Sequence, residues 1–390
     1  MLGRIKKELQ LVYSSKVQSH NGKRVTYLDM VRGIAIFLVV VGHSGLIDLD
    51  KNVWLSTFHL PVFFVVSGML IQLKKEEEQL FIKVILRKLK SIMLPYLWFS
   101  AVSLLLDVIQ LVRGFFTADV LKEHIVQTVT LQGYSVLWFL PVLLLAEIFM
   151  FLLLKLYGRM NSKMRVAMLS VITSILMSVG MFYGYHFLAT SSISALILGE
   201  IRILTKAVIA SALIAVGYLT GICFEKLKKK DMKVSDKKPC FHFSPVALIV
   251  GLALAAVNIL AAPYVQLMDI NNVNVGNPLL YIGLGITGSL GLILICKSIP
   301  NIPFITFYGQ NTLIVMCTHL NFYVMNIGMI LGNKLFVPLP GPDGLQFMLG
   351  AMICTMLLEI PVILFIRIFI PFMIGQGYDR GILAETTSNS

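Results

Sequence analysis

The sequence predicts an all-α integral membrane protein, a polytopic bundle of about ten transmembrane helices with both termini in the cytoplasm. Hydrophobic residues make up 57% of the 390-residue chain and charged residues only 14%, and the mean hydropathy is +0.83. Soluble domains carry more charge and less apolar sequence than this. Apolar runs of about twenty residues, the length that crosses a bilayer, recur along the whole chain. Basic residues cluster in alternate connecting segments, as they do in polytopic membrane proteins.

The apolar runs predict ten spans, each able to cross the hydrocarbon core as a helix. In chain order they cover residues 31–48, 54–73, 92–112, 136–155, 166–187, 206–224, 243–263, 278–297, 304–331 and 345–374. The last two are longer than a straight crossing needs, so we expect them to be tilted or broken.

The distribution of Lys and Arg predicts the orientation. With ten spans, one side of the membrane holds 26 of these residues and the other side holds six, while Arg367 lies inside the last span. Cytoplasmic segments are the ones enriched in Lys and Arg. Both termini are therefore expected in the cytoplasm.

The chain divides into three parts by composition. Residues 1–24 form a basic cytoplasmic arm, residues 25–375 form one membrane domain, and residues 376–390 form a short polar tail. The net charge of +13 comes without any pattern typical of nucleic-acid binding, so membrane lipid is the expected partner and nucleic acid is not. The five cysteines are scattered and none has metal-ligand spacing, so no metal is expected.

The first span contains an arginine and a histidine that are expected to share a helix face. Ten residues lie between Arg32 and His43, and the eleven steps of ~100° from one to the other leave the two side chains only ~20° apart around a helix. Along the axis they would lie ~16 Å apart, so Arg32 would mark the membrane edge and His43 would lie near mid-depth. Ionisable groups at that depth usually face a cavity or a neighbouring helix. The structural alternative is that Arg32 is only a topology anchor and that His43 only packs against a neighbouring helix.

Two further groups of polar residues follow. His59 and Pro61 begin the second span at its external end, and Arg87 and Lys90 precede the third span on the cytoplasmic side. Three residues apart on a helix, Arg87 and Lys90 would share a face. Together with Arg32 they could hold a polyanionic molecule at the cytoplasmic edge, although each could also act only as a topology anchor.

Five ordered motifs resemble the membrane acyltransferase-3 family, and more narrowly its branch of fucose 4-O-acetylase-like enzymes that O-acetylate cell-surface polysaccharides. They are Tyr27-Leu-Asp29-Met-Val-Arg32-Gly…Gly42-His43-Ser44, Phe58-His59-Leu-Pro61-Val-Phe-Phe…Ser67-Gly68, Arg87…Lys90…Pro95-Tyr96, Leu137-Trp138-Phe139-Leu-Pro141 and Gly309-Gln-Asn311-Thr-Leu…His319. The resemblance covers about residues 25–370.

This resemblance implies an integral membrane O-acetyltransferase that uses cytoplasmic acetyl-CoA as donor substrate. It assigns His43 as the catalytic base, Arg32 to the CoA phosphates, and Arg87 and Lys90 to cofactor binding. The family often has arginine at the position of Lys90, so bidentate phosphate contact there is not expected. The implied acceptor is a sugar hydroxyl of a cell-surface or exported polysaccharide or of its lipid-linked precursor. The expected location is the bacterial plasma membrane.

Several other polar residues are candidates for contacting the acceptor or for supporting His43. They are Asp29, Ser44, His59, Trp138, Asn311, His319 and Glu359. An acidic residue could orient the histidine, as carboxylates do in other acyl-transfer sites. For His319 and Glu359, pairing between helices is the structural alternative. For Trp138 the alternative is a place in the aromatic belt.

Two other functions fit the same pattern. A secondary transporter or flippase of a lipid-linked sugar would also place ionisable groups near mid-depth. Within the acyltransferase class, succinyl transfer is the alternative to acetyl transfer.

Overall fold

The structure is a computed structural model that describes residues 25–44, 53–160, 162–234, 244–336 and 345–376. Within these ranges the chain forms helices and turns, and its only β-type pairing is an isolated bridge between Asp269 and Asn274. The arm predicted over 1–24, and the tail from residue 377 onward, lie outside the described residues.

The helices of the first half are α2 (Thr26–His43), α3 (Val53–Phe58), α4 (Pro61–Leu73), α5 (Phe81–Lys88), α6 (Leu94–Val112), α7 (Ala118–Val129) and α8 (Phe139–Tyr157). Those of the second half are α9 (Lys163–Ala189), α10 (Ala195–Val234), α11 (Pro245–Ala261), α12 (Pro278–Ser298), α13 (Pro303–Gln310), α14 (Thr312–Thr318), α15 (Val324–Phe336) and α16 (Leu345–Phe369). A π-helical turn, Leu89–Met93, joins α5 to α6.

Nine helices in the described ranges are long and apolar enough to cross a membrane, and they correspond to nine of the ten predicted spans. The exception is the span predicted over 304–331, which is divided into α13, α14 and α15. The chain bends at Asn311 between α13 and α14, and at Tyr323, whose φ is +57°, before α15. The all-α, multi-pass class is confirmed. Of the two long segments expected to be tilted or broken, 304–331 is broken, which reduces the number of continuous spans, whereas α16 continues from Leu345 to Phe369.

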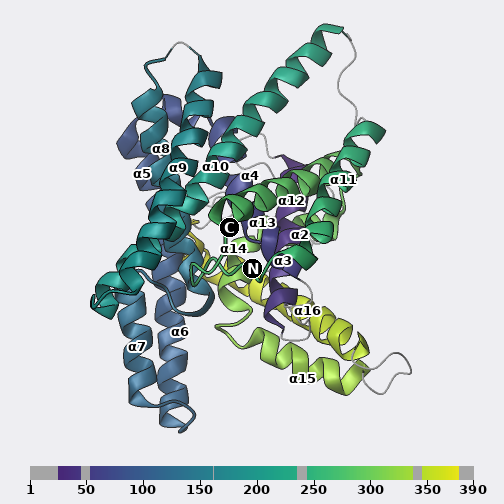
Figure 1. The fold of residues 1–390 in the computed structure, drawn as a ribbon. Helices are drawn as coiled ribbons and strands as arrows, with labels where there is room; N and C mark the ends of the chain where they lie inside the picture. Colours follow the sequence, from purple (N-terminus) through teal and green to yellow (C-terminus); the bar gives the residue numbers. More distant parts are fainter. Residues whose placement is uncertain (1–24, 45–52, 161, 235–243, 337–344, 377–390) are drawn as a thin grey trace, which may run out of the picture.

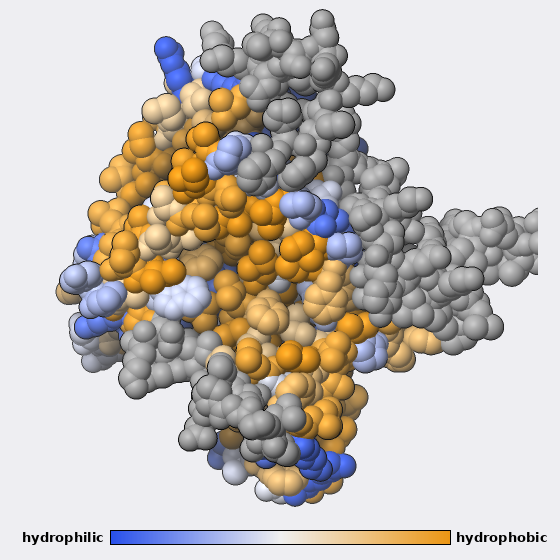
Figure 2. Space-filling view, turned by 90° about the vertical axis from the view of Figure 1, so that its right-hand side faces the viewer, coloured by the Kyte–Doolittle hydropathy of each residue, from blue (hydrophilic) through white to orange (hydrophobic). Residues whose placement is uncertain are grey.

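The surface is that of a membrane protein. Figure 2 shows one face dominated by apolar side chains, with hydrophilic ones gathered toward its edges. Large apolar side chains such as Leu105, Leu176, Phe187 and Leu260 are more than half exposed. Exposed apolar area of this extent is unfavourable in water and favourable against lipid tails.

Helix α10 packs against α4, α8 and α9, and α2 packs against α13, while α15 and α16 form a separate pair (Figure 1). Glycines allow the closest crossings. A Cβ at Gly309 of α13 would overlap the backbone oxygen of Asp29, and one at Gly33 of α2 would overlap that of Ile305. The backbones of α2 and α13 therefore touch directly beside Arg32.

Candidate active site

A single helix carries the two residues that the sequence singled out. Both Arg32 and His43 lie on α2, so their axial separation is the ~16 Å expected for eleven residues. The guanidinium of Arg32 lies 3.7 Å from the carboxylate of the buried Asp29, one turn earlier on the same helix. The helix thus connects a charged end to a histidine near its other end.

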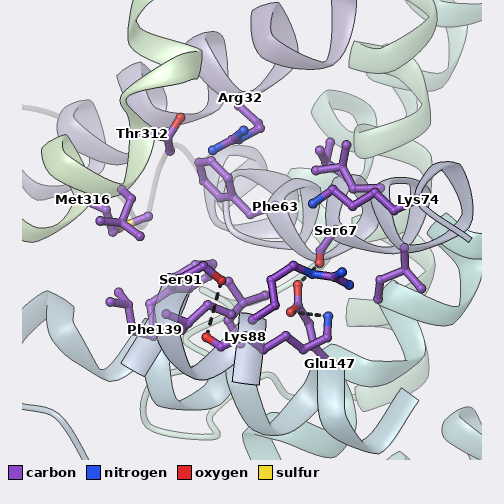
Figure 3. Close-up of a pocket in the computed structure, with 18 of the residues that line it drawn as sticks. Arg32, Phe63, Ser67, Lys74, Lys88, Ser91, Phe139, Glu147, Thr312 and Met316 are labelled. Atoms are coloured by element: carbon purple, nitrogen blue, oxygen red, sulfur yellow. Dashed lines mark hydrogen bonds and ion pairs between the residues drawn. The ribbon is translucent and has the colours of Figure 1, made fainter. Parts of the chain in front are cut away.

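Arg32 borders a cavity of about 380 Å³, here called the Arg32 cavity. Its lining comes from α2, α4, α5, α8, α14 and the segments that follow α4 and α5. Four basic side chains face it (Arg32, Lys74, Arg87 and Lys88), against two acidic ones (Glu76 and Glu147). The excess of positive charge suits an anionic ligand. Figure 3 shows Arg32 on one side of this cavity and Lys88 with Glu147 on the other.

A buried ion-pair network forms the wall opposite Arg32. The ammonium of Lys88 lies 2.8 Å from a carboxylate oxygen of Glu76 and 2.8 Å from one of Glu147, and Ser67 donates a hydrogen bond to Glu147. The Lys88 side chain is only 5% exposed. Buried charges are tolerated when they are paired in this way. The network therefore ties α4, α5 and α8 together and leaves a defined wall.

Arg87 lines the Arg32 cavity and Lys90 does not. The guanidinium of Arg87 contacts Glu76 at 2.8 Å and donates to Gln79 at 2.7 Å. Lys90 lies in the π-helical turn after α5 and is exposed. A π-helical turn is wider than an α-helical one, so a separation of three residues no longer keeps Lys90 on the face of Arg87. The basic neighbours of Arg32 across the cavity are instead Arg87, Lys88 and Lys74.

The segment after α4 is held against the start of α9. Lys163 donates to Glu78 at 2.6 Å and to Glu77 at 3.2 Å. The hydrogen bond from Lys163 lowers the pKa of the Glu78 carboxyl below its ordinary value. Lys155 also donates to the backbone oxygen of Glu77 at 2.8 Å. These contacts fix the segment that carries Lys74 and Glu76.

His43 borders a second cavity of about 360 Å³, here called the His43 cavity. Its polar lining includes His59, Ser56 and Asp269, and Trp138 forms part of its wall. The side chain of His43 is exposed, whereas that of His59 is half-buried. The structure thus brings together His43, His59 and Trp138, which the sequence proposed for catalysis or acceptor contact.

The hydrogen bonds of His43 leave one ring nitrogen available. Its Nδ1 lies 3.0 Å from the backbone oxygen of Val39 and 3.3 Å from Nε2 of His319. Nδ1 of His319 lies 2.7 Å from the backbone oxygen of Val315, and that side chain is fully buried. Protons on both Nδ1 atoms satisfy all three contacts. In that tautomer the Nε2 of His43 carries a lone pair and can accept a proton.

Three other sequence candidates line neither cavity. Glu359 is fully buried and accepts hydrogen bonds from Thr318, the residue before His319, at 2.9 and 3.1 Å. Asn311 accepts a hydrogen bond from Arg367 at 3.0 Å, which links α16 to the bend between α13 and α14. Ser44 donates to the backbone oxygen of Val41 at 2.7 Å at the end of α2.

The two cavities are neighbours, and Phe139 and Met316 line both of them. These side chains therefore separate the basic Arg32 cavity from the histidine-containing His43 cavity. A long ligand with an anionic end and an acyl end would extend past them. Neither residue was a site candidate in the sequence, although Phe139 belongs to one of the quoted motifs, because apolar side chains in apolar spans carry no distinguishing pattern.

The sequence did not predict that Lys88, Glu147 and Ser67 form one network. It also did not predict that Asp269 lines the same cavity as His43. The buried position of Glu147 inside a span was a usable signal, because an acidic residue there needs a partner. Its partner could not be chosen from sequence. Among the residues that the structure describes, no three His, Cys, Asp or Glu side chains converge in a way that suits a metal ion.

Chemically, the arrangement combines an anion-attracting cavity with an adjoining cavity that holds an unprotonated imidazole nitrogen. The chain belongs to the acyltransferase-3 family, because the family model described as an acyltransferase domain matches residues 25–374. No curated protein and no solved structure gives a significant match. The chain is therefore a multi-pass membrane acyltransferase.

Proposed function

We propose that this membrane acyltransferase transfers an acetyl group from acetyl-CoA to a sugar hydroxyl, with His43 as general base. The acceptor is a cell-surface or exported polysaccharide or its lipid-linked precursor, and the enzyme resides in the bacterial plasma membrane. The observation that carries the proposal is the pair of adjoining cavities along α2, a basic one lined by Arg32 and one lined by His43.

The donor would bind with its phosphates in the Arg32 cavity. Arginine side chains are suited to phosphate because their planar guanidinium can donate two parallel hydrogen bonds. Arg32 and Arg87 reach this cavity from two different helices, and Lys74 also lines it. The thioester arm would then extend past Phe139 and Met316 toward His43. The ~16 Å along α2 between Arg32 and His43 sets the span that the arm must cover.

Transfer in the His43 cavity would begin with proton abstraction. Nε2 of His43 takes the proton of the sugar hydroxyl as its oxygen attacks the thioester carbonyl carbon. The carbon–sulfur bond then breaks, and the departing sulfur receives the proton from His43. The products are an acetyl ester and the free thiol of CoA. His319, with its Nε2 beside Nδ1 of His43, would stabilise the imidazolium that forms in between.

The orientation follows from the charge distribution. The 26-to-six bias of Lys and Arg supports a cytoplasmic location for the end of α2 that carries Arg32. Acetyl-CoA would enter from that side. The family assignment favours acyl transfer over the transport of a lipid-linked sugar. A transporter would also not be expected to bind acetyl-CoA.

The decisive experiment measures donor and product together. Membranes that contain the protein are incubated with acetyl-CoA or succinyl-CoA labelled in the acyl group, and label transferred to glycan is quantified. We expect acetyl transfer that is absent from membranes lacking the gene, together with a matching loss of acetyl esters from the surface glycans of a deletion strain. Transfer of succinyl in preference to acetyl would contradict the proposed donor, and unchanged glycan acetylation would contradict the proposed acceptor.

A further inference from the structure

A third hollow lies next to the His43 cavity and has a different character. It has a volume of about 130 Å³ and is lined by Gln127, Gln132, Gly133, Ser135, Arg202, Ile203, Lys206, Asn271 and Asn272. We call it the Arg202–Lys206 recess. Two of its residues, Ser135 and Asn271, also line the His43 cavity. The two hollows are therefore adjacent, and one molecule could occupy both.

The charge of this recess is unbalanced. Arg202 and Lys206 line it, and no carboxylate is among its nine lining residues. The two cations are four residues apart on α10, so they share a face, where like charges repel. Asp269, the nearby acidic residue, lines the His43 cavity instead, and its carboxylate accepts hydrogen bonds from the backbone N–H groups of Asn271 and Asn272 at 2.8 and 3.3 Å.

Lys206 is the more deeply buried of the two cations. Its side chain is 3% exposed, its Nζ lies 3.1 Å from Oδ1 of Asn271, and it lies 4.6 Å above the ring of Trp138. An ammonium removed from water is costly unless an opposite charge is nearby, and for Lys206 the attraction of Asp269 is opposed by the repulsion of Arg202. An amide oxygen and an aromatic face compensate only in part. A bound anion would supply the remaining stabilisation through charge-assisted hydrogen bonds.

The other polar groups of the recess suit a sugar. Gln127, Gln132, Asn271 and Asn272 line it, and an amide can both donate and accept hydrogen bonds, as a hydroxyl group does. Part of this capacity is used within the protein, because Gln127 donates to Glu123 and Asn272 donates to Asp269. The volume fits one charged substituent with an adjoining part of a ring rather than a whole sugar chain. Trp138 lies both under Lys206 and in the wall of the His43 cavity. The rest of the sugar ring would therefore extend toward His43.

We propose that the Arg202–Lys206 recess binds an anionic group of the acceptor, so that the acceptor is a negatively charged glycan. The inference rests on the proposed function, because it names the class of acceptor that reaches His43. The anionic group can be the carboxylate of an acidic sugar or the phosphate of a lipid-linked sugar. Both would be held by the same two cations, and the test separates them.

The test measures the binding of three small probes to the purified full-length protein in nanodiscs of zwitterionic lipid. The probes are D-glucuronate for the carboxylate, glucose 1-phosphate for the phosphate, and D-glucose as the neutral sugar. Tryptophan fluorescence reports binding because Trp138 lies against Lys206. Arg202→Gln and Lys206→Met remove the two cations. Arg113→Gln is the matched control, because Arg113 is exposed and lines none of the three cavities.

We expect one charged probe to bind ~10- to 100-fold more tightly than glucose. The preference should disappear in Arg202→Gln and persist in Arg113→Gln. The tighter of the two charged probes then identifies the source of the anion. Arg202 is half-buried, so Arg202→Gln remains informative even when Lys206→Met fails to fold.

Three results would overturn the inference: equal affinity for all three probes, no saturable binding of either charged probe, or a preference that survives in Arg202→Gln. Acetyl-CoA binding, measured on the same samples, separates this inference from the proposed function. Protein that binds acetyl-CoA but shows no anion preference contradicts the recess alone. Protein that shows the preference but does not bind acetyl-CoA supports the recess and contradicts the donor.

Discussion

His43 and His319 come from segments 276 residues apart, and Nε2 of His319 lies 3.3 Å from Nδ1 of His43. Their ring centroids are 5.2 Å apart. The contact fixes one side of the His43 ring and leaves Nε2 as the nitrogen that can accept a proton. Because His319 directly follows α14, the break in the segment 304–331 is what brings this histidine to α2.

His43→Ala should abolish most of the acetyl transfer while the protein still inserts and binds acetyl-CoA. A positioned general base contributes ~10²–10⁴-fold in rate, so we expect a loss of that size. The measurement is acetyl transfer to the native glycan in membranes, normalised to protein level. His186→Ala is the matched control, because His186 lies outside the two proposed substrate cavities and contacts the backbone oxygen of Val273.

His59→Ala and His319→Ala should reduce transfer less than His43→Ala does, since neither would take the proton directly. Wild-type transfer by His43→Ala would exclude the mechanism. Loss of the protein from the membrane in His43→Ala would instead identify His43 as a helix-packing residue.

Transfer should require the neutral form of His43. Protonated imidazole cannot accept a proton, so the rate should fall about tenfold per pH unit below the pKa of the His43 imidazole. The rate should level off above it. The measurement is kcat against pH with saturating acetyl-CoA. Residual activity of His43→Ala should lack this acidic limb, and an identical limb in that variant would assign the titration to another group.

Arg32→Ala should weaken acetyl-CoA binding ~10- to 100-fold, because a charge-assisted phosphate contact contributes ~1.5–3 kcal/mol. Arg87→Ala should have a similar but smaller effect, since its guanidinium also contacts Glu76. Lys90→Ala should change little, because Lys90 is exposed and lies outside the cavity. Calorimetric titration of purified protein measures all three affinities. Strong binding in both arginine variants, or a large loss in Lys90→Ala, would contradict the proposed donor site.

Gly309→Ala should destabilise the protein by ~1–3 kcal/mol, the cost of overpacking, because its Cβ would overlap the backbone of Asp29. The displaced α13 should also weaken acetyl-CoA binding, since α2 carries Arg32 at this crossing. Gly283→Ala is the matched control, because nothing lies within 4 Å of its Cβ position. Thermal unfolding in nanodiscs compares the two. Equal melting temperatures would show that the crossing tolerates a methyl group.

The topology can be tested with single cysteines in a cysteine-free background. Asn272→Cys should react with a membrane-impermeant maleimide in intact cells, because it lies beside the Arg202–Lys206 recess on the expected external side. Glu78→Cys should react only after permeabilisation, because it lies in the segment after α4, on the expected cytoplasmic side. The opposite pattern would reverse the orientation inferred from the basic residues and would place the Arg32 cavity outside.

Hydropathy and charge are properties of short stretches of chain, so they were enough to predict the all-α, multi-pass class and nearly every span. The sequence likewise predicted that Arg32 and His43 share one helix, because their separation depends only on helix geometry. The sequence also allowed Arg32 and Arg87 to be placed near each other, because both flank spans on the expected cytoplasmic side.

Tertiary packing decided the rest, because contacts between distant segments leave no local pattern. It selected His319 rather than Glu359 as the neighbour of His43, since the bends around α14 direct the histidine to α2. It placed Lys88 rather than Lys90 at the cavity, since a π-helical turn follows α5. It also brought Arg202, Lys206 and four amide residues together in one recess, although they come from α10, from α7 and from loops far apart in the chain.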